Sequence, residues 1–347
     1  MSTLRPDAAA RTGTRTGRTI VTLTPAPAID RTYSVDTLRG GAVHRAHTVT
    51  ETLGGNGVNV TRALLAHGAA SHAVAPLSPE ALAPLDDDAR SGLTPVDLGV
   101  RTRVNTVVTA ADGVTTNVNE APAPLTRAQW TTLTVAVLRT TLETDARWLV
   151  MTGCLPAVAG GDHLVDVLPL VVAARTIGLS VAFDVPGHQL TAVLDPLAPV
   201  DLVKPNVDEL AQAVGHPVTT VDETVRAARA LLTRGAHRAL VTMGAAGALL
   251  VDAHRHELVP GVATDCVDTT GAGDAALAGY LAAETDDATP SDAARRAVRW
   301  GAAAVAQRGA ALRATPVTRA DGTRPSHAPH QTDLSTWLRV DSLAAIG

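Results

Sequence analysis

A glycine-rich segment near the C-terminal end of the chain carries the strongest chemical signal. It reads Asp268-Thr-Thr-Gly-Ala-Gly-Asp274 and runs directly into an apolar stretch that favours a helix. Gly271 and Gly273 have no Cβ, so backbone N–H groups there can close around an anion at the positive end of that helix. A carboxylate at Asp274 is unfavourable beside an anion unless it takes part in chemistry, and a base beside a transferring phosphoryl group fits. The segment therefore indicates phosphoryl transfer, although an Asp in a first helical turn can also act as a simple cap.

Six further polar or glycine-rich segments precede it: TPAPAID (24–30), GGNGVN (54–59), TRVN (102–105), NEAPAP (119–124), GCLP (153–156) and KPNVDE (204–209). Alone, each is weak. An Asp after a strand is commonly a turn residue, and an Asn followed three residues later by Glu fits a capping box. In this order and spacing, together with DTTGAGD, they resemble the PfkB/ribokinase family of sugar kinases over about residues 20–315. Within that family they look most like 1-phosphofructokinases, with tagatose-6-phosphate kinases and minor 6-phosphofructokinases as near alternatives.

The resemblance implies specific roles for the glycine-rich segment. Asp274 is expected to be the general base that accepts the proton of the sugar hydroxyl during attack on the γ-phosphoryl group. The backbone amides of Gly271, Ala272 and Gly273 are expected to form the anion hole.

The same resemblance assigns two groups of ligands and implies ATP and Mg²⁺ as cofactors. A phosphosugar acceptor is expected to contact Asp30, Gly54, Gly55, Asn59, Arg45, Arg103 and Cys154, the two arginines gripping its own phosphate. The nucleotide is expected near Lys204, Thr242, Gly244 and Gly247, and the metal ion near Asn206 and Glu209. Lys204 is the only lysine in an arginine-rich chain.

Three departures from the family pattern affect the expected acceptor site. Asn56 stands where the most similar subfamilies have Lys, which removes a cation and could weaken acceptor binding by about ten- to a hundredfold. Cys154 replaces the usual Ser, and a thiol is a poorer hydrogen-bond donor. The usual glycine-rich stretch after Leu77 is absent. A catalytically silent sugar-phosphate sensor is therefore an alternative, although the retained Asp274 argues against it.

Composition restricts the class of protein. A chain of 347 residues with 46% hydrophobic and 18% charged positions suits one large globular domain. The net charge of −5 predicts neither a nucleic-acid nor a membrane partner. Two cysteines without C-x-x-C spacing favour a reduced, cytoplasmic protein. The first strand is not followed by G-x-G-x-x-G, which disfavours a nicotinamide-dependent Rossmann enzyme. A homodimer is common among members of the resembled family.

Alternating strand and helix patterns predict an α/β fold with a largely parallel sheet. The resemblance implies a ribokinase-like three-layer α/β/α sandwich with a small β-sheet lid. Two β-rich segments without a following helix, about 31–52 and 103–119, fit that lid as a small antiparallel sheet, the second turning at Asp112-Gly113. Residues 1–18 are expected to form a disordered tail, 19–315 the kinase domain, and 316–347 a loop and terminal helix. Expected strands lie at 20–24, 147–152, 180–184, 202–204, 238–242 and 248–252, and helices at 58–67, 163–177, 207–214, 222–234, 273–283 and 291–307.

Overall fold

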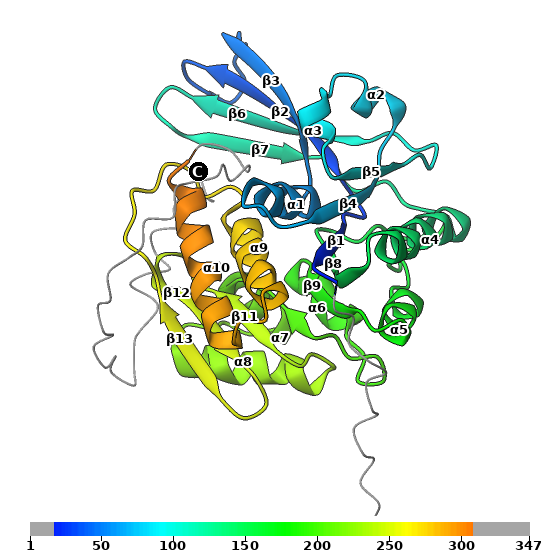
Figure 1. Cartoon of the computed structure of the whole chain (residues 1–347). Helices are drawn as coiled ribbons and strands as arrows, with labels where there is room; N and C mark the ends of the chain where they lie inside the picture. The colour runs from blue at the N-terminus through cyan, green and yellow to red at the C-terminus, as the bar shows by residue number, and fades with distance from the viewer. Residues whose placement is uncertain (1–16, 308–347) are drawn as a thin grey trace, which may run out of the picture.

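The computed structural model describes residues 17–307, and within them a large sheet between two helical layers and a smaller sheet standing off it (Figure 1). The large sheet has nine strands in the order β13-β12-β11-β10-β9-β8-β1-β4-β5. Strands from β11 to β5 in this order run parallel, and β12 and β13 add an antiparallel edge. Their bounds are β1 Thr19–Leu23, β4 Ser71–Pro76, β5 Leu93–Val96, β8 Ala146–Thr152, β9 Ser180–Asp184, β10 Leu202–Val203, β11 Ala239–Thr242, β12 Gly247–Val251 and β13 His256–Pro260.

Helices cover both faces of this sheet. One face packs against α1 (Asn56–Ala66), α9 (Ala272–Thr285) and α10 (Pro290–Val305). The opposite face packs against α4 (Arg127–Glu143), α5 (Leu168–Thr176), α6 (Gly187–Val193), α7 (Val207–Val214) and α8 (Val221–Thr233). Two one-turn helices, α2 (Pro79–Leu82) and α3 (Asp87–Arg90), follow β4. The fold is therefore the predicted three-layer α/β/α sandwich.

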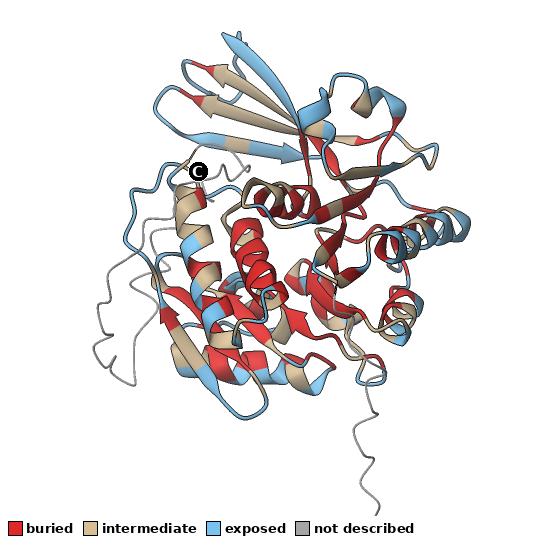
Figure 2. Cartoon of the chain, in the orientation of Figure 1, coloured by how far each residue is buried: buried red, intermediate tan, exposed pale blue. Residues whose placement is uncertain are grey.

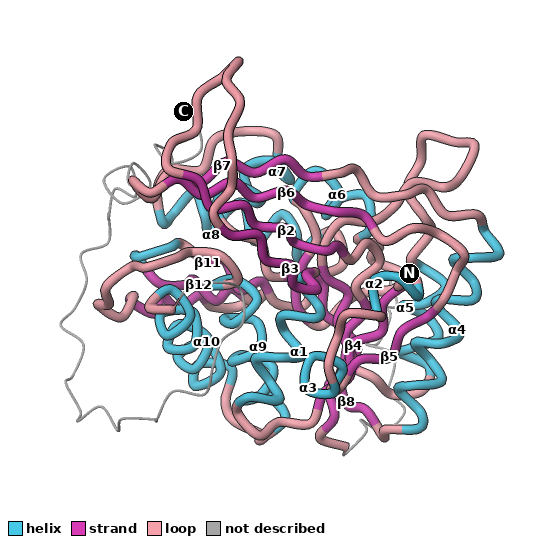
Figure 3. Tube along the Cα trace, turned by 90° about the horizontal axis from the view of Figure 1, so that it is seen from above, coloured by secondary structure: helices cyan, strands magenta, loops and turns pink. Residues whose placement is uncertain are grey.

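The smaller sheet, which we call the lid sheet, contains the strands β3-β2-β6-β7. Their bounds are β2 Ala28–Val35, β3 Thr48–Gly54, β6 Arg103–Ala110 and β7 Thr115–Asn119. From above, these strands lie side by side with α1 next to β3 (Figure 3). The prediction of a purely antiparallel lid was wrong, because β2 and β6 pair in parallel over eight residues. The long excursion through α1, β4 and β5 between them lets β6 return in the same direction as β2.

Burial separates the two sheets clearly (Figure 2). The central strands and almost all of α9 are buried, whereas lid strands β3 and β7 are largely exposed. A sheet with such an open face has little apolar surface to hold it rigidly, so the lid sheet is the part best suited to move relative to the sandwich.

Most predicted elements lie within two residues of the observed bounds, including α7 at 207–214. The helix predicted at 163–177 was too long, because residues near Leu164 are extended: Leu164 forms a β-bridge with Ala157 and the Val165 amide donates to Pro156 O. Helix α5 begins only at Leu168, beside a proline in its first turn. The tight turn at Asp112-Gly113 is confirmed by a φ of +90° at Gly113. The predicted N-terminal tail, up to residue 16, and the predicted C-terminal loop and helix lie outside the described residues.

Among residues 17–307, none of the helices combines the length and apolar character that a membrane span requires.

Candidate active site

Polar side chains gather at the carboxyl ends of the parallel strands, where ligands of α/β sheets bind. Asp184 ends β9, Lys204 follows β10, and Thr242 ends β11. The first turns of α1 and α9 contribute Asn59 and Asp274 to the same region. Side chains from elements more than 200 residues apart in the sequence therefore meet at one edge of the sheet.

Asp274 is a buried carboxylic acid in the first turn of α9, with 7% of its surface exposed. The side-chain amide of Asn59 donates to Asp274 Oδ2 at 2.8 Å. Burial raises the pKa of Asp274 to about 7, and the nearby Asp184 carboxylate adds to this, while Asn59 and Lys204 act in the opposite direction. A group with a pKa near neutrality can both accept and release a proton under physiological conditions, as a general base must.

The backbone before Asp274 has the shape expected of an anion site. Gly271 adopts φ +76°, a left-handed conformation that glycine accepts readily, and it caps α9. The Ala272 amide donates to Thr269 O at 3.2 Å, so one of the three amides assigned to the anion hole already has a partner. The next amides open the helix, where N–H groups have no acceptor inside it. The anion hole was predicted from three amides, and the Ala272 amide is not free to take part in it.

Lys204, the single lysine of the chain, lies next to Gly273 in this turn. A Cβ at Gly273 would lie 3.3 Å from Lys204 Nζ. Lys204 forms an ion pair of 3.0 Å with Asp184, and both side chains are 5% exposed. Burial acts to lower the pKa of Lys204, but the Asp184 and Glu209 carboxylates outweigh it, so the net shift is upward and the ammonium stays charged. Sequence reasoning missed Asp184, although an aspartate closing an apolar strand (SVAFD) was a usable signal.

Asn206 and Glu209 form a complete capping box at the start of α7. Asn206 Oδ1 accepts from the Glu209 amide and Glu209 Oε2 accepts from the Asn206 amide, both at 2.8 Å. Burial raises the pKa of the Glu209 carboxyl, with Lys204 opposing the shift. No group of three or more His, Cys, Asp or Glu side chains in the part of the chain that the structure describes is arranged to hold a metal ion. The capping role is therefore present, and metal binding remains a prediction.

A second polar cluster lies where the lid sheet joins the sandwich. Asn105 Nδ2 donates to Asp30 Oδ1 at 2.9 Å, across the parallel β2–β6 pair. Burial raises the pKa of Asp30, while Asn105, Arg103 and Arg62 act to lower it. A methyl group at Gly54 would overlap the Asp30 carboxylate, so any larger residue there would displace that side chain. Gly55 adopts φ +128°, again a glycine conformation.

The two predicted arginines lie in different places. Arg103 donates to Ala26 O through Nε and Nη2 at 3.3 and 3.0 Å, and to Glu120 O through Nη1 at 2.7 Å. Arg45 lies in the exposed loop at the other end of the β2–β3 hairpin, so the structure does not bring it to Asp30. Arg62 was not predicted: its Nη1 donates to Leu53 O at 2.6 Å, and burial lowers its pKa.

The remaining predicted residues lie in turns. Half-buried Cys154 follows Gly153, which adopts φ +86°, and a Cβ at Gly153 would lie 3.8 Å from Asn56 Oδ1. The exposed Asn56 therefore lies beside the Cys154 loop.

The turn after β11 starts at Thr242, whose amide donates to Pro205 O at 3.1 Å next to the Asn206 bridge. Gly244 has φ +54°, and Gly247 has φ +104°, where a Cβ would overlap Val259 O. These contacts place the turn beside the capping box of α7. The positive φ values of the turn are sufficient to account for Gly244 and Gly247.

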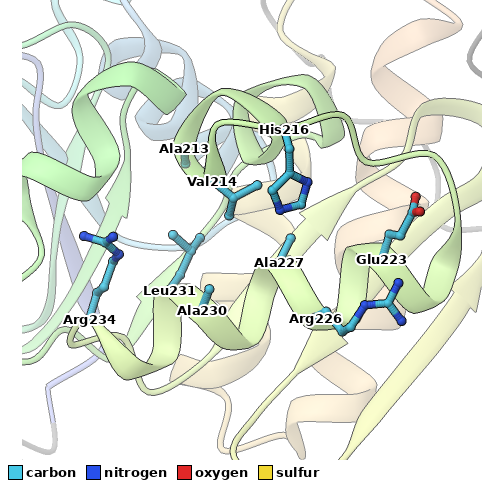
Figure 4. Close-up of a pocket in the computed structure, with 9 residues that line it drawn as sticks. All are labelled: Ala213, Val214, His216, Glu223, Arg226, Ala227, Ala230, Leu231 and Arg234. Atoms are coloured by element: carbon cyan, nitrogen blue, oxygen red, sulfur yellow. The ribbon is translucent and has the colours of Figure 1, made fainter.

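A cavity of about 430 Å³ lies elsewhere, between the C-terminal end of α7 and α8 (Figure 4). Val214 and Leu231 form part of its aliphatic lining, and Arg226 and Arg234 lie toward its two ends. None of the predicted site residues lines it.

Comparison with known proteins decides the family. The profile described as "pfkB family carbohydrate kinase" matches residues 20–317. The chain belongs to this family. A 1-phosphofructokinase of Haloferax volcanii is 36% identical over 285 residues, covering 80% of this chain and 88% of the relative. A 1-phosphofructokinase of Xanthomonas campestris is 32% identical over 306 residues, covering 85% and 93%. The crystal structure of phosphofructokinase-2 from Escherichia coli in complex with potassium matches with a TM-score of 0.74 and 27% identity, covering 85% of this chain and 94% of that chain.

Proposed function

We propose that this PfkB-family protein is an ATP- and Mg²⁺-dependent kinase that converts fructose 1-phosphate into fructose 1,6-bisphosphate. The observation that carries the proposal is Asp274, a buried carboxyl group with a pKa of about 7 at the N-terminus of α9, beside the Lys204 ammonium. The names of the two relatives, both 1-phosphofructokinases, support the choice of acceptor. In this reaction the acceptor already carries a phosphate, whereas a simple sugar kinase acts on an unphosphorylated sugar.

The residues suggest a direct in-line transfer. Asp274 takes the proton of the free primary hydroxyl of the phosphosugar as that oxygen attacks the γ-phosphorus of ATP, and the bond to the β–γ bridging oxygen breaks to release ADP. The Gly273 amide and the Lys204 ammonium stabilise the charge that develops on the transferring group. Asn59 fixes the orientation of Asp274 through its hydrogen bond. The proton then leaves Asp274 for solvent after product release, which a pKa near 7 permits.

Asn206 and Glu209 are the proposed side chains for Mg²⁺. Glu209 Oε2 is engaged in the cap, and a carboxylate has a second oxygen that can accept a metal-bound water. When bound, the ion would neutralise phosphate charge during transfer. The residues present fit an ion held mainly by phosphates and water, since the protein offers no closed carboxylate cage among residues 17–307.

Asp30, Gly54, Gly55, Asn59, Arg103 and Cys154 are the proposed acceptor contacts, and Thr242, Gly244 and Gly247 the nucleotide contacts. The lid sheet carries Asp30 and Arg103, so its closure would bring both to the sugar while excluding water. Arg103 must exchange at least one backbone carbonyl for the acceptor's phosphate. Arg45 would take part only if the lid hairpin bends, which makes it the weakest member of this set.

We also propose a cytoplasmic homodimer. The cysteines Cys154 and Cys266 are free thiols, as a reducing compartment requires. Exposed Val49 and Val118 lie on lid strands β3 and β7, an apolar surface that a second copy could cover. Light scattering of the purified protein tests this, and a monomer at micromolar concentration would contradict it.

A turnover assay tests the function. Purified protein is incubated with MgATP and, separately, fructose 1-phosphate, fructose 6-phosphate, tagatose 6-phosphate, fructose and ribose, and ADP release is followed. Selective turnover of fructose 1-phosphate that is lost in Asp274→Ala supports both the reaction and the base. Selectivity for fructose 6-phosphate or tagatose 6-phosphate would support the same mechanism with a different acceptor. Binding of ATP and phosphosugar with no ADP would instead support a sensor.

A further inference from the structure

Gln189 is a buried amide that holds the loop carrying Cys154. It lies on α6 and is 7% exposed. Its side-chain Oε1 accepts from the Leu155 amide at 2.8 Å, and its Nε2 donates back to Leu155 O at 3.3 Å. One side chain thus satisfies both backbone polar groups of the residue that follows Cys154, much as a neighbouring strand would.

Two other contacts fix this loop, which we define as residues 153–156. The Gly153 amide donates to Asp184 O at 2.8 Å, which ties the start of the loop to the end of β9. The Val165 amide donates to Pro156 O at 3.0 Å, which ties its end. The Gln189 contacts lie between them. Cys154 is therefore held between the Asp184 contact on one side and the Gln189 contacts on the other.

The same helix touches the opposite side of the site. A methyl group at Gly187, the first residue of α6, would overlap the backbone of Glu209 on α7. Helix α6 is thus packed against the helix that carries Asn206 and Glu209, while Gln189 in the same first turn holds the 153–156 loop. Because it follows β9 directly, it also starts three residues after Asp184, the partner of Lys204.

We propose that Gln189 is a positioning residue for acceptor binding: it sets the position of Cys154 relative to the Asp274–Lys204 pair by clamping the backbone of Leu155. The proposal rests on the proposed function in so far as Cys154 contacts the phosphosugar. Gln189 does not touch the substrates itself. Its removal should therefore act on the acceptor and leave the nucleotide, which is expected on the other side of Asp274 near Thr242, unaffected.

The test compares Gln189→Met, which keeps the length of the side chain and removes both hydrogen bonds, with His188→Ala on the exposed side of the same helix. Acceptor KM, ATP KM and kcat are measured with fructose 1-phosphate, and acceptor affinity is also measured by calorimetry. We expect Gln189→Met to raise acceptor KM and Kd about five- to twentyfold, with ATP KM changed less than twofold. His188→Ala should change none of these values.

A second variant covers the case in which Gln189→Met does not fold. Gln189→Ala removes both hydrogen bonds without requiring a methionine side chain to fit the same space, and it should raise acceptor Kd in the same direction. Equal changes in acceptor and ATP constants, or an unchanged acceptor Kd in a folded variant, would overturn the proposal. Calorimetry separates the kinase proposal from the Gln189 proposal. Wild-type protein that binds fructose 1-phosphate without turnover would contradict the kinase function, while the acceptor Kd of the Gln189 variants would still test the positioning role.

Discussion

The hydrogen bond from Asn59 to Asp274 allows the proposed base to be tested without removing it. Asp274 must be ionised to accept a proton, so kcat/KM should fall as the pH falls through its pKa, which lies at about 7. Asn59 is 8% exposed and donates to Asp274 Oδ2 at 2.8 Å. It therefore stabilises the ionised form and holds this pKa lower than burial alone would.

The size of the effect follows from the geometry. A hydrogen bond to a charged group contributes about 1.5–3 kcal/mol. Because one pKa unit corresponds to about 1.4 kcal/mol, loss of the Asn59 donor should move the acid limb of the profile upward by about one to two pH units. The Asn59→Ala variant should thus be about ten- to a hundredfold less active than wild type at pH 6.5 and recover most of that loss above pH 9.

The assay is a series of kcat/KM measurements for fructose 1-phosphate from pH 5.5 to 9.5. Thermal unfolding of both proteins confirms that the variant is folded, and Asp274→Ala gives the background rate. If Asn59 served only as a sugar contact, its loss would lower kcat/KM by the same factor at every pH. An equal drop in kcat/KM at every pH, with no change in the pH of the acid limb, or a wild-type profile that is flat between pH 5.5 and 8.5, would refute the assignment of Asp274.

Three further predictions follow from the same contacts. Asp274→Asn should be inactive but more stable than wild type at pH 8, by up to about 4 kcal/mol. The native state binds more protons than the unfolded state between pH 3.8 and about 7, so this group's contribution to stability falls as the pH rises; the difference in Tm should be less than half as large at pH 5 and should close at about pH 3. Gly54→Ala should raise acceptor KM at least tenfold by displacing the Asp30 carboxylate, whereas Gly40→Ala, with open space around its α-carbon, should not; equal kinetics would contradict this. Arg103→Ala should raise the KM for fructose 1-phosphate about tenfold with little effect on ATP KM, and an unchanged value would argue against a phosphorylated acceptor.

Local patterns were sufficient for most of the sandwich. Capping boxes at the starts of α7 and α8 and the glycine before α9 mark helix boundaries in the sequence itself. The direction of β2 relative to β6 could not be read in this way. Both strands are rich in β-branched residues and both end at turns, so their pairing depends on the path of the chain between them, which no local pattern encodes.

The site shows a similar division. The segment around Asp274 was visible because its glycines have a direct backbone role, and Gly54 because the family pattern contains it. Asp184 and Gln189 were missed, since an aspartate at the end of an apolar strand and a glutamine in the first turn of a short helix each have many uses. Their roles arise only when β9 and β10 lie side by side and α6 packs against the 153–156 loop.

The pair formed by Asp184 and Lys204 connects these observations. A buried lysine without a partner would lose its proton, and a buried aspartate beside Asp274 would raise the pKa of that base still further. Paired at 3.0 Å, they keep a fixed positive charge under Gly273, while Asp184 still contributes to a pKa of about 7 at Asp274. A charged Lys204 beside Gly273 and an Asp274 carboxyl group that titrates near neutrality are therefore both linked to the same ion pair.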